Sequence, residues 1–135
     1  MSGQTYVVLM GPREGEGKLR FLRVEDVEAG VPKLRDEKIN MSVAANTDIF
    51  DEDLTAEYNG FWIIQITADT AGYPLLRLTP AGSAVTVTAA LNEASDLTAD
   101  ALYEFWVAAK KDDAINIRFS TSATVTVRVF FARSA

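Results

Sequence analysis

The sequence predicts an all-β domain in which antiparallel strands pack as a sandwich or barrel, and two observations carry this prediction. In residues 124–131, Val125, Val127, Val129 and Phe131 alternate with Thr, Arg and Phe side chains, the period of two that is typical of a strand with one buried face. Turn signals separate the β-prone runs at spacings of roughly ten residues, which favours antiparallel strands over alternating strands and helices.

The first forty residues show a weaker pattern than the rest of the chain. Residues 5–10 and 18–24 are short β-prone runs, and residues 31–38 are charged with no clear period. We interpret residues 1–40 as a looser N-terminal arm that becomes ordered in an assembly, and an ordinary pair of edge strands is the alternative. The β-sandwich domain is then predicted to span residues 41–135.

The remaining strands follow from short apolar runs between turns. Residues 61–67 are apolar on both faces, which predicts a central strand covered on both sides. Residues 102–109 fit a strand, which the β-branched runs nearby favour. A helix is the alternative, because helical spacing also relates Leu102, Phe105, Trp106 and Ala109. The compact part begins at residues 39–44, the other predicted strands are at 75–79, 84–91, 114–119 and 124–131, and loops are predicted at 46–53 and 92–100.

Composition bounds the class of protein. Of the 135 residues, 48% are hydrophobic, which is enough for one folded domain with its own core. The 19 acidic and 13 basic residues give a net charge of −6, which argues against nucleic acid because phosphate binding needs a clustered basic face. No apolar run approaches the ~20 residues of a membrane span, and the N-terminus lacks a signal-peptide pattern. We therefore expect a soluble protein whose partners include neither nucleic acid nor a membrane.

The residue types exclude most catalytic chemistry. The chain contains no Cys and no His, which excludes disulfides, thiol nucleophiles, His-ligated zinc and the Ser-His-Asp triad. A Gly-rich stretch at residues 11–18 ends in Gly17-Lys18 but continues with Leu19, where a phosphate-binding P-loop needs Ser or Thr. We therefore expect no enzyme activity and no cofactor.

Carboxylates cluster in the predicted loop at residues 46–53 and make it the best candidate for a hard cation such as calcium. The candidate ligands are Asp48, Asp51 and Asp53. The loop is not an EF-hand, because Ala56 and Trp62 stand where an EF-hand counted from Asp51 needs Gly and Glu. A solvated acidic turn is the alternative interpretation.

Aromatic residues offer a second kind of binding site. Planar rings can stack on the apolar face of a sugar, and the candidates are Tyr58, Trp62, Tyr73, Tyr103 and Trp106. Both tryptophans lie inside apolar strands, which favours burial in the core or in a subunit interface over a sugar platform.

Four stretches within residues 47–131 carry a resemblance to a known family. They are TDIFDEDLT from Thr47, the aromatic and aliphatic strand from Phe61, DLTADALYEF from Asp96 and DAINIRFSTS from Asp113. On these stretches the segment, roughly two-thirds of the chain, resembles small virion structural proteins of phages and related viruses, which are capsid decoration or minor capsid proteins.

The resemblance implies a single jelly roll or related β-sandwich that assembles as a trimer and builds or decorates an icosahedral shell. It implies further copies of the chain and a major capsid protein as partners, and a place on the capsid exterior after synthesis in the host cytoplasm. The side chains expected in subunit contacts are Trp106, Phe130, Phe131 and Tyr6. A shell-forming and a shell-decorating role both remain open. The alternative function is a carbohydrate- or receptor-binding module of a virus spike or tail.

Overall fold

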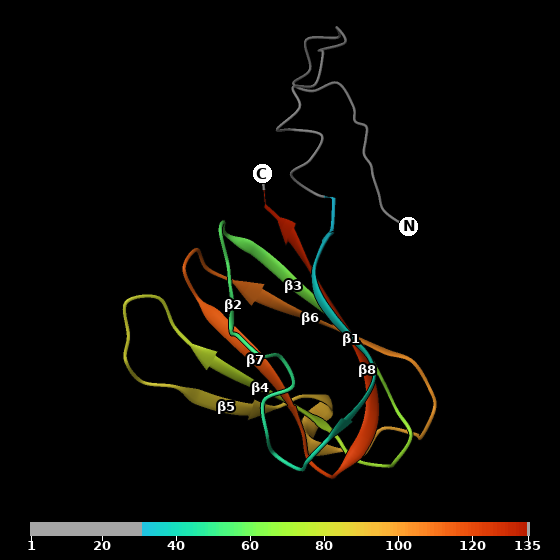
Figure 1. Ribbon diagram of the computed structural model, residues 1–135. Helices are drawn as coiled ribbons and strands as arrows, with labels where there is room; N and C mark the ends of the chain where they lie inside the picture. Colours follow the sequence, from blue (N-terminus) through green and yellow to red (C-terminus); the bar gives the residue numbers. More distant parts are fainter. Residues whose placement is uncertain (1–30, 135) are drawn as a thin grey trace, which may run out of the picture.

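The computed structural model describes residues 31–134, and within this range the chain is all β apart from one 3₁₀ turn, Asn92–Ala94. Two antiparallel four-stranded sheets pack together, with the strand orders β1-β8-β3-β6 and β2-β7-β4-β5 (Figure 1). The predicted antiparallel sandwich is therefore confirmed. The strands are β1 (Lys33–Val43), β2 (Leu54–Thr55), β3 (Gly60–Ala68), β4 (Pro74–Thr79), β5 (Val87–Ala90), β6 (Tyr103–Ala109), β7 (Ala114–Phe119) and β8 (Ala123–Arg133).

The strands pair in a nested series around the β4–β5 hairpin. Outward from this hairpin, β3 pairs with β6, β2 with β7 and β1 with β8, all antiparallel. Successive pairs of the series alternate between the two sheets, and the pairings β3–β8 and β4–β7 complete them. Eight strands arranged as a folded antiparallel ribbon in two sheets form a jelly roll.

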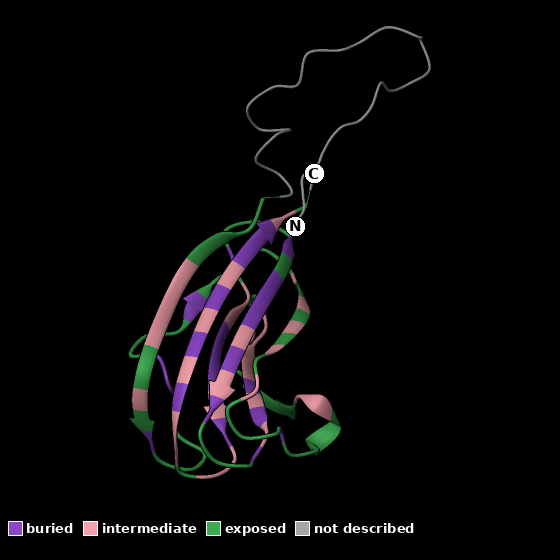
Figure 2. Ribbon diagram, turned by 90° about the vertical axis from the view of Figure 1, so that its right-hand side faces the viewer, coloured by how far each residue is buried: buried purple, intermediate pink, exposed green. Residues whose placement is uncertain are grey.

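The core lies between the sheets and is built from the inward-facing residues of each strand. Successive side chains of a strand point to opposite faces, and Figure 2 shows buried residues alternating with half-buried ones along neighbouring strands. The alternation in residues 124–131 places Val125, Val127 and Val129 in the core, fully buried, as predicted. Opposite them, Ile117 and Phe119 of β7 are also fully buried.

Strands β3 and β6 resolve two of the predictions. Residues 103–109 form a strand, not a helix, and pair with β3 without a register shift from Ile66↔Tyr103 to Gly60↔Ala109. Strand β3 is central, between β8 and β6, as predicted. Its predicted cover on both faces is wrong near its start, because Phe61 is exposed on the outer face.

Strand β5 is shorter than the alternation in residues 84–91 predicts. It spans only Val87–Ala90, and all four of its residues are exposed. Because β5 is the last strand of its sheet, the alternating pattern extends beyond the area that the opposite sheet covers.

Strand β1 begins at Lys33, so the predicted boundary between arm and sandwich at residue 41 is wrong. The strand pairs with β8 along its length and forms one edge of its sheet. Two shifts in register, one of them between Lys38 and Met41, and the positive φ of Asn40 interrupt its alternation. Bulges of this kind remove the period of two from the sequence, which explains why residues 31–38 showed no pattern.

Residues 1–30 lie outside the described residues, and with them the predicted strands at 5–10 and 18–24 and most of the predicted arm. Within residues 31–134, none of the helical segments has the length and apolar character needed to cross a membrane.

Candidate functional site

An apolar strip crosses the outer face of the β1-β8-β3-β6 sheet near the start of β1. Its members are register partners in adjacent strands: Leu34 opposes Phe130, Phe130 opposes Ile63, and Ile63 opposes Trp106. Phe61 lies two residues before Ile63 on β3 and therefore faces the same side of the sheet. We call Leu34, Phe61, Ile63, Trp106 and Phe130 the outer-face strip.

Most of the outer-face strip is open to solvent. Leu34 is 49% exposed, Phe61 42% and Trp106 58%, whereas Ile63 at the centre is 4% exposed. The rings of Phe61 and Trp106 lie 6.1 Å apart at 55°, within the range of aromatic pairs that attract each other. Apolar side chains that are scattered singly need no explanation, but a contiguous exposed group of them marks an interaction surface.

A row of polar side chains borders the outer-face strip on one side. Arg128 Nε donates to Glu37 Oε1 at 3.0 Å, and Gln65 Nε2 donates to Glu104 Oε1 at 3.0 Å. The indole Nε1 of Trp106 donates to Glu104 Oε2 at 2.8 Å. The hydrogen bond from Gln65 lowers the pKa of Glu104 the most, and the hydrogen bond from Trp106 lowers it further. The row therefore gives the strip a charged edge and fixes the orientation of its most exposed ring.

The structure separates the residues that were predicted to form a subunit interface. Trp106 and Phe130 belong to the outer-face strip. The prediction for Phe131 is wrong: it is 6% exposed, and its ring packs edge-on against Trp62 with centroids 4.9 Å apart. Phe131 lies two residues after the buried Val129 on the same strand, so the period of two already indicates that its side chain points into the core. Tyr6 lies outside the described residues.

Three residues of the outer-face strip were not singled out from the sequence. Phe61 and Ile63 alternate with Trp62 and Ile64 on β3. Because successive residues of a strand face opposite sides of the sheet, apolar residues at all four positions indicate that the outer face is apolar too. From the sequence alone, the same pattern predicts a strand covered on both faces by the rest of the protein. Leu34 could not be found in this way, because it lies in the irregular strand β1.

The five aromatic residues considered for sugar stacking do not form one platform. Trp62 is buried, and Tyr103 packs against the core. Tyr73 is half-buried just before β4 in the other sheet. Tyr58 is exposed in the loop between β2 and β3. Only Trp106 lies on the outer face of the β1-β8-β3-β6 sheet, beside the other exposed members of the strip.

The acidic loop is held by arginines. Arg77 Nη2 lies 2.7 Å from Asp48 Oδ2 and 2.5 Å from Asp53 Oδ1, and Arg118 Nε lies 2.7 Å from Asp48 Oδ1. The Asp51 side chain is 85% exposed and points away from this cluster towards Lys38. Within residues 31–134 no group of three or more acidic side chains could hold a metal ion. The arginine pairs thus favour the acidic turn over a calcium site, because guanidinium groups neutralise carboxylates that a cation would need.

No protein-family model, no curated protein and no solved structure matches this chain.

Proposed function

We propose that this chain is a non-enzymatic virion structural protein, a capsid decoration or minor capsid component. In this proposal it associates as a trimer and stabilises the shell by binding the major capsid protein on the capsid exterior. The outer-face strip carries the proposal, because it is an apolar surface of the kind that a partner subunit covers.

The fold supports the proposal at a general level. Jelly rolls with two four-stranded sheets occur in viral capsid and lectin domains, although a fold does not assign a function by itself. The resemblance of residues 47–131 to virion structural proteins points in the same direction. Capsid assembly needs surfaces and no catalytic groups, which agrees with a chain that has neither Cys nor His.

The composition of the outer-face strip suits a contact between subunits. Interface centres are enriched in aromatic residues and surrounded by polar groups, as Trp106, Phe61 and Phe130 are bordered by the row that contains Arg128 and Glu104. Tryptophan is among the residues whose removal most often weakens an interface. The net charge of −6 keeps free subunits apart in solution.

The native mass of the full chain, measured by light scattering, tests the self-association. We expect a trimer, and we expect Trp106→Thr to lower the mass while the variant stays folded, because the ring is exposed and threonine suits a strand. Val85→Thr is the matched control: Val85 is 65% exposed but lies in the loop before β5, and its replacement should leave the trimer intact. A wild-type protein that is monomeric at every concentration would rule out the trimer.

The virion role has its own test. The protein should co-purify with particles in a fixed ratio to the major capsid protein, and Trp106→Thr should reduce that ratio while Val85→Thr preserves it. Particles that lack the protein, purified from cells that make it, would exclude the role.

A carbohydrate- or receptor-binding module is the second candidate, favoured by one observation. The exposed ring of Trp106 lies beside the carboxylate of Glu104 and the amide of Gln65, a combination that can stack on a sugar and hydrogen-bond its hydroxyl groups. A glycan array would separate the two functions. Glycan binding that Trp106→Thr abolishes, in a protein whose native mass does not change, would favour the binding module.

A further inference from the structure

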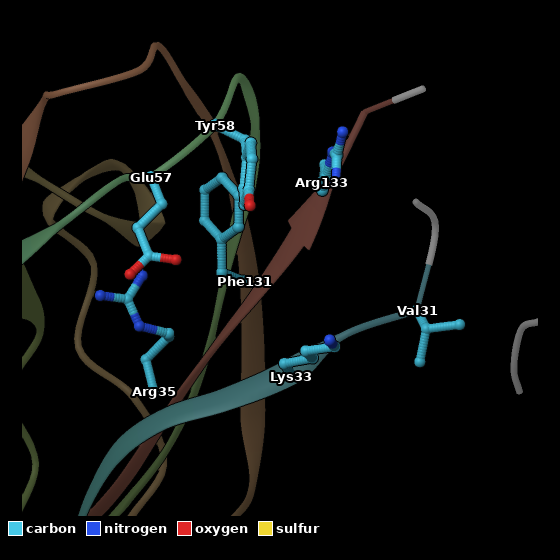
Figure 3. A pocket seen from close by; sticks show the side chains of 7 residues that line it. All are labelled: Val31, Lys33, Arg35, Glu57, Tyr58, Phe131 and Arg133. Atoms are coloured by element: carbon cyan, nitrogen blue, oxygen red, sulfur yellow. The ribbon is translucent and has the colours of Figure 1, made fainter. Parts of the chain in front are cut away.

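A small pocket lies at the pole of the sandwich where β1 begins and β8 ends (Figure 3). Its volume is about 150 Å³, close to that of a cavity that holds one benzene ring. Arg35 and Arg133 line it from these two strands, together with Glu57, Tyr58 and Phe131. The pocket thus brings two guanidinium groups to two aromatic rings.

The arginines outside this pocket, among residues 31–134, are all ion-paired. Arg77 and Arg118 pair with Asp48, and Arg128 pairs with Glu37. Neither arginine of the pocket has a carboxylate within ion-pair distance in the same part of the chain. Among the described residues, the two arginines of the pocket are therefore the ones without an ion pair, although Glu57 points toward Arg35 within the pocket (Figure 3).

Neutral groups position both of these arginines. Arg35 Nη2 donates to the backbone oxygen of Thr55 at 3.0 Å, and Arg35 Cζ lies 5.4 Å from the centroid of the Trp62 ring. Arg133 Cζ lies 4.1 Å from the centroid of the Tyr58 ring, a distance typical of a cation–π contact. These contacts order the side chains without neutralising them, which reduces the entropy that an incoming anion would have to overcome.

The pocket also has the opposite charge to the chain as a whole. Arg35 and Arg133 line it against a single acid, Glu57, whereas the chain carries a net charge of −6. Concave sites lined by one sign of charge concentrate the electrostatic field. The excess of arginine over glutamate at this pole therefore favours an anion as the ligand.

We propose that this pocket binds a carboxylate carried on a small apolar or aromatic group. A guanidinium group recognises a carboxylate through paired N–H donors in one plane. Tyr58 and Phe131 provide apolar surface for the group that carries the carboxylate. The carboxylate comes from a free organic acid or from the end of a polypeptide chain. This inference is independent of the proposed virion role.

Titration of the ¹⁵N-labelled full chain with benzoate, followed by amide chemical shifts, tests the proposal. We expect saturable shifts confined to the residues around the pocket, with a dissociation constant on the order of 1 mM. Benzamide, which has the same ring without the charge, should bind at least roughly tenfold more weakly, and so should acetate, which lacks the ring. Inorganic phosphate, an anion without a carboxylate, should bind more weakly than benzoate.

Two arginine variants make the result specific. Arg133→Gln should weaken benzoate binding roughly tenfold, and the dispersion of the same spectra verifies that the variant is folded. Arg118→Gln, which removes an arginine outside the pocket and outside the outer-face strip, should leave the affinity unchanged. A non-saturable response, equal losses in both variants, equal binding of benzamide or tighter binding of phosphate would overturn the proposal. A short peptide with a free C-terminus, compared with its amidated form, identifies the source: tighter binding of the peptide acid than of benzoate assigns a chain end, and the reverse assigns a free acid.

Discussion

Arg77 holds Asp48 through two parallel hydrogen bonds, from Nε to Oδ1 at 3.0 Å and from Nη2 to Oδ2 at 2.7 Å. The pair joins the acidic loop before β2 to the middle of β4, across the outer face of the β2-β7-β4-β5 sheet. Paired hydrogen bonds between arginine and a carboxylate are stronger and more directional than single ones. Arg118 and Asp53 extend the pair into a cluster of four charged side chains.

This cluster makes Asp48 the acidic residue whose replacement should cost the most stability in the loop. We expect Asp48→Asn to lower the free energy of unfolding by about 1–2 kcal/mol, because it removes the charge that two arginines share. Asp51→Asn is the matched control, since an exposed pair of this kind contributes less than about 0.5 kcal/mol. Urea unfolding measures both, and equal losses would show that the arginines do not hold the loop.

The same cluster predicts a loss of stability in acid. Partial burial raises the pKa of Asp48, but hydrogen bonds from Arg77 and Arg118 outweigh it and lower the pKa below the ordinary value of 3.8. A folded-state pKa below that of the unfolded chain gives stability that is complete above the unfolded pKa and is lost as the pH falls through the folded pKa. The free energy of unfolding should therefore fall below about pH 4.

Comparison of two proteins isolates the contribution of Asp48 to this acid effect. The fall between about pH 5 and about pH 2 should be smaller in Asp48→Asn than in the wild type, because the titrating group has been removed. Part of the fall in the free energy of unfolding should persist in Asp48→Asn, because two other carboxyls also have a lowered pKa. The backbone of Thr124 donates to Asp69, and Gln65 donates to Glu104. Identical pH profiles for the two proteins would refute the assignment.

Gly60 at the start of β3 should tolerate no side chain. A Cβ at this position would collide with the backbone oxygen of Ala132, and neither strand can move because β3 lies between two neighbours. We expect Gly60→Ala to cost about 3 kcal/mol or more. Gly82 is the control: a Cβ there meets nothing within 4 Å, but its φ is +75°, so Gly82→Ala should cost only about 1 kcal/mol of backbone strain. Thermal unfolding that ranks Gly82→Ala as the worse substitution would contradict this reasoning.

Asn116 is the buried polar residue that ties the acidic loop to β7. It is 1% exposed, accepts from the Phe50 and Ile117 backbone N–H groups, and donates to Phe50 O and Asp53 Oδ1 at 3.0 Å each. Asn116→Asp would place a carboxylate against these two acceptors, so we expect a loss of about 3 kcal/mol at neutral pH. The loss should shrink in acid, where the new carboxyl is protonated and can donate again.

Asn46→Asp provides the comparison for the Asn116 variant. Asn46 is exposed in the same loop, and aspartate tolerates the positive φ of this position, so its replacement should cost less than about 0.5 kcal/mol. A loss for Asn116→Asp that does not vary with pH would point to shape, and not charge, as the cause.

The strands that could be predicted from the sequence are those whose alternation is matched by burial. In β8 the valines alternate because one face of the strand meets the other sheet, and the pattern survives along the whole strand. In β1 the bulges break the pattern although pairing with β8 continues. In β5 the pattern exists without the burial. Alternation thus predicts the full length of a strand only where the opposite sheet covers it.

The candidate site was harder to predict because it depends on strand register. Trp106 was singled out, but its neighbours Ile63 and Phe130 are 43 and 24 residues away in the chain, and only the pairing of β3 with β6 and β8 brings them together. The arginine cluster has the same origin, since Arg77 and Arg118 reach Asp48 from two different strands. The carboxylates of the loop are visible in the sequence, whereas the cations that neutralise them are not.

The pairing of β1 with β8 also determines how the domain responds to a pulling force. Lys33, near the start of the described chain, is the register partner of Phe131, near its end, so both ends leave from one pole (Figure 1). In an antiparallel ladder the hydrogen bonds lie perpendicular to the strands, and tension between these two ends acts along the bonds of the first pair. The pairs then bear the load one after another, from Lys33 towards Val43, as in the opening of a zipper. Pulling on both ends at this pole should therefore open the sandwich at a low force. Tension between this pole and the turns at the opposite end would instead have to shear β8 past both of its neighbours, β1 and β3, at once.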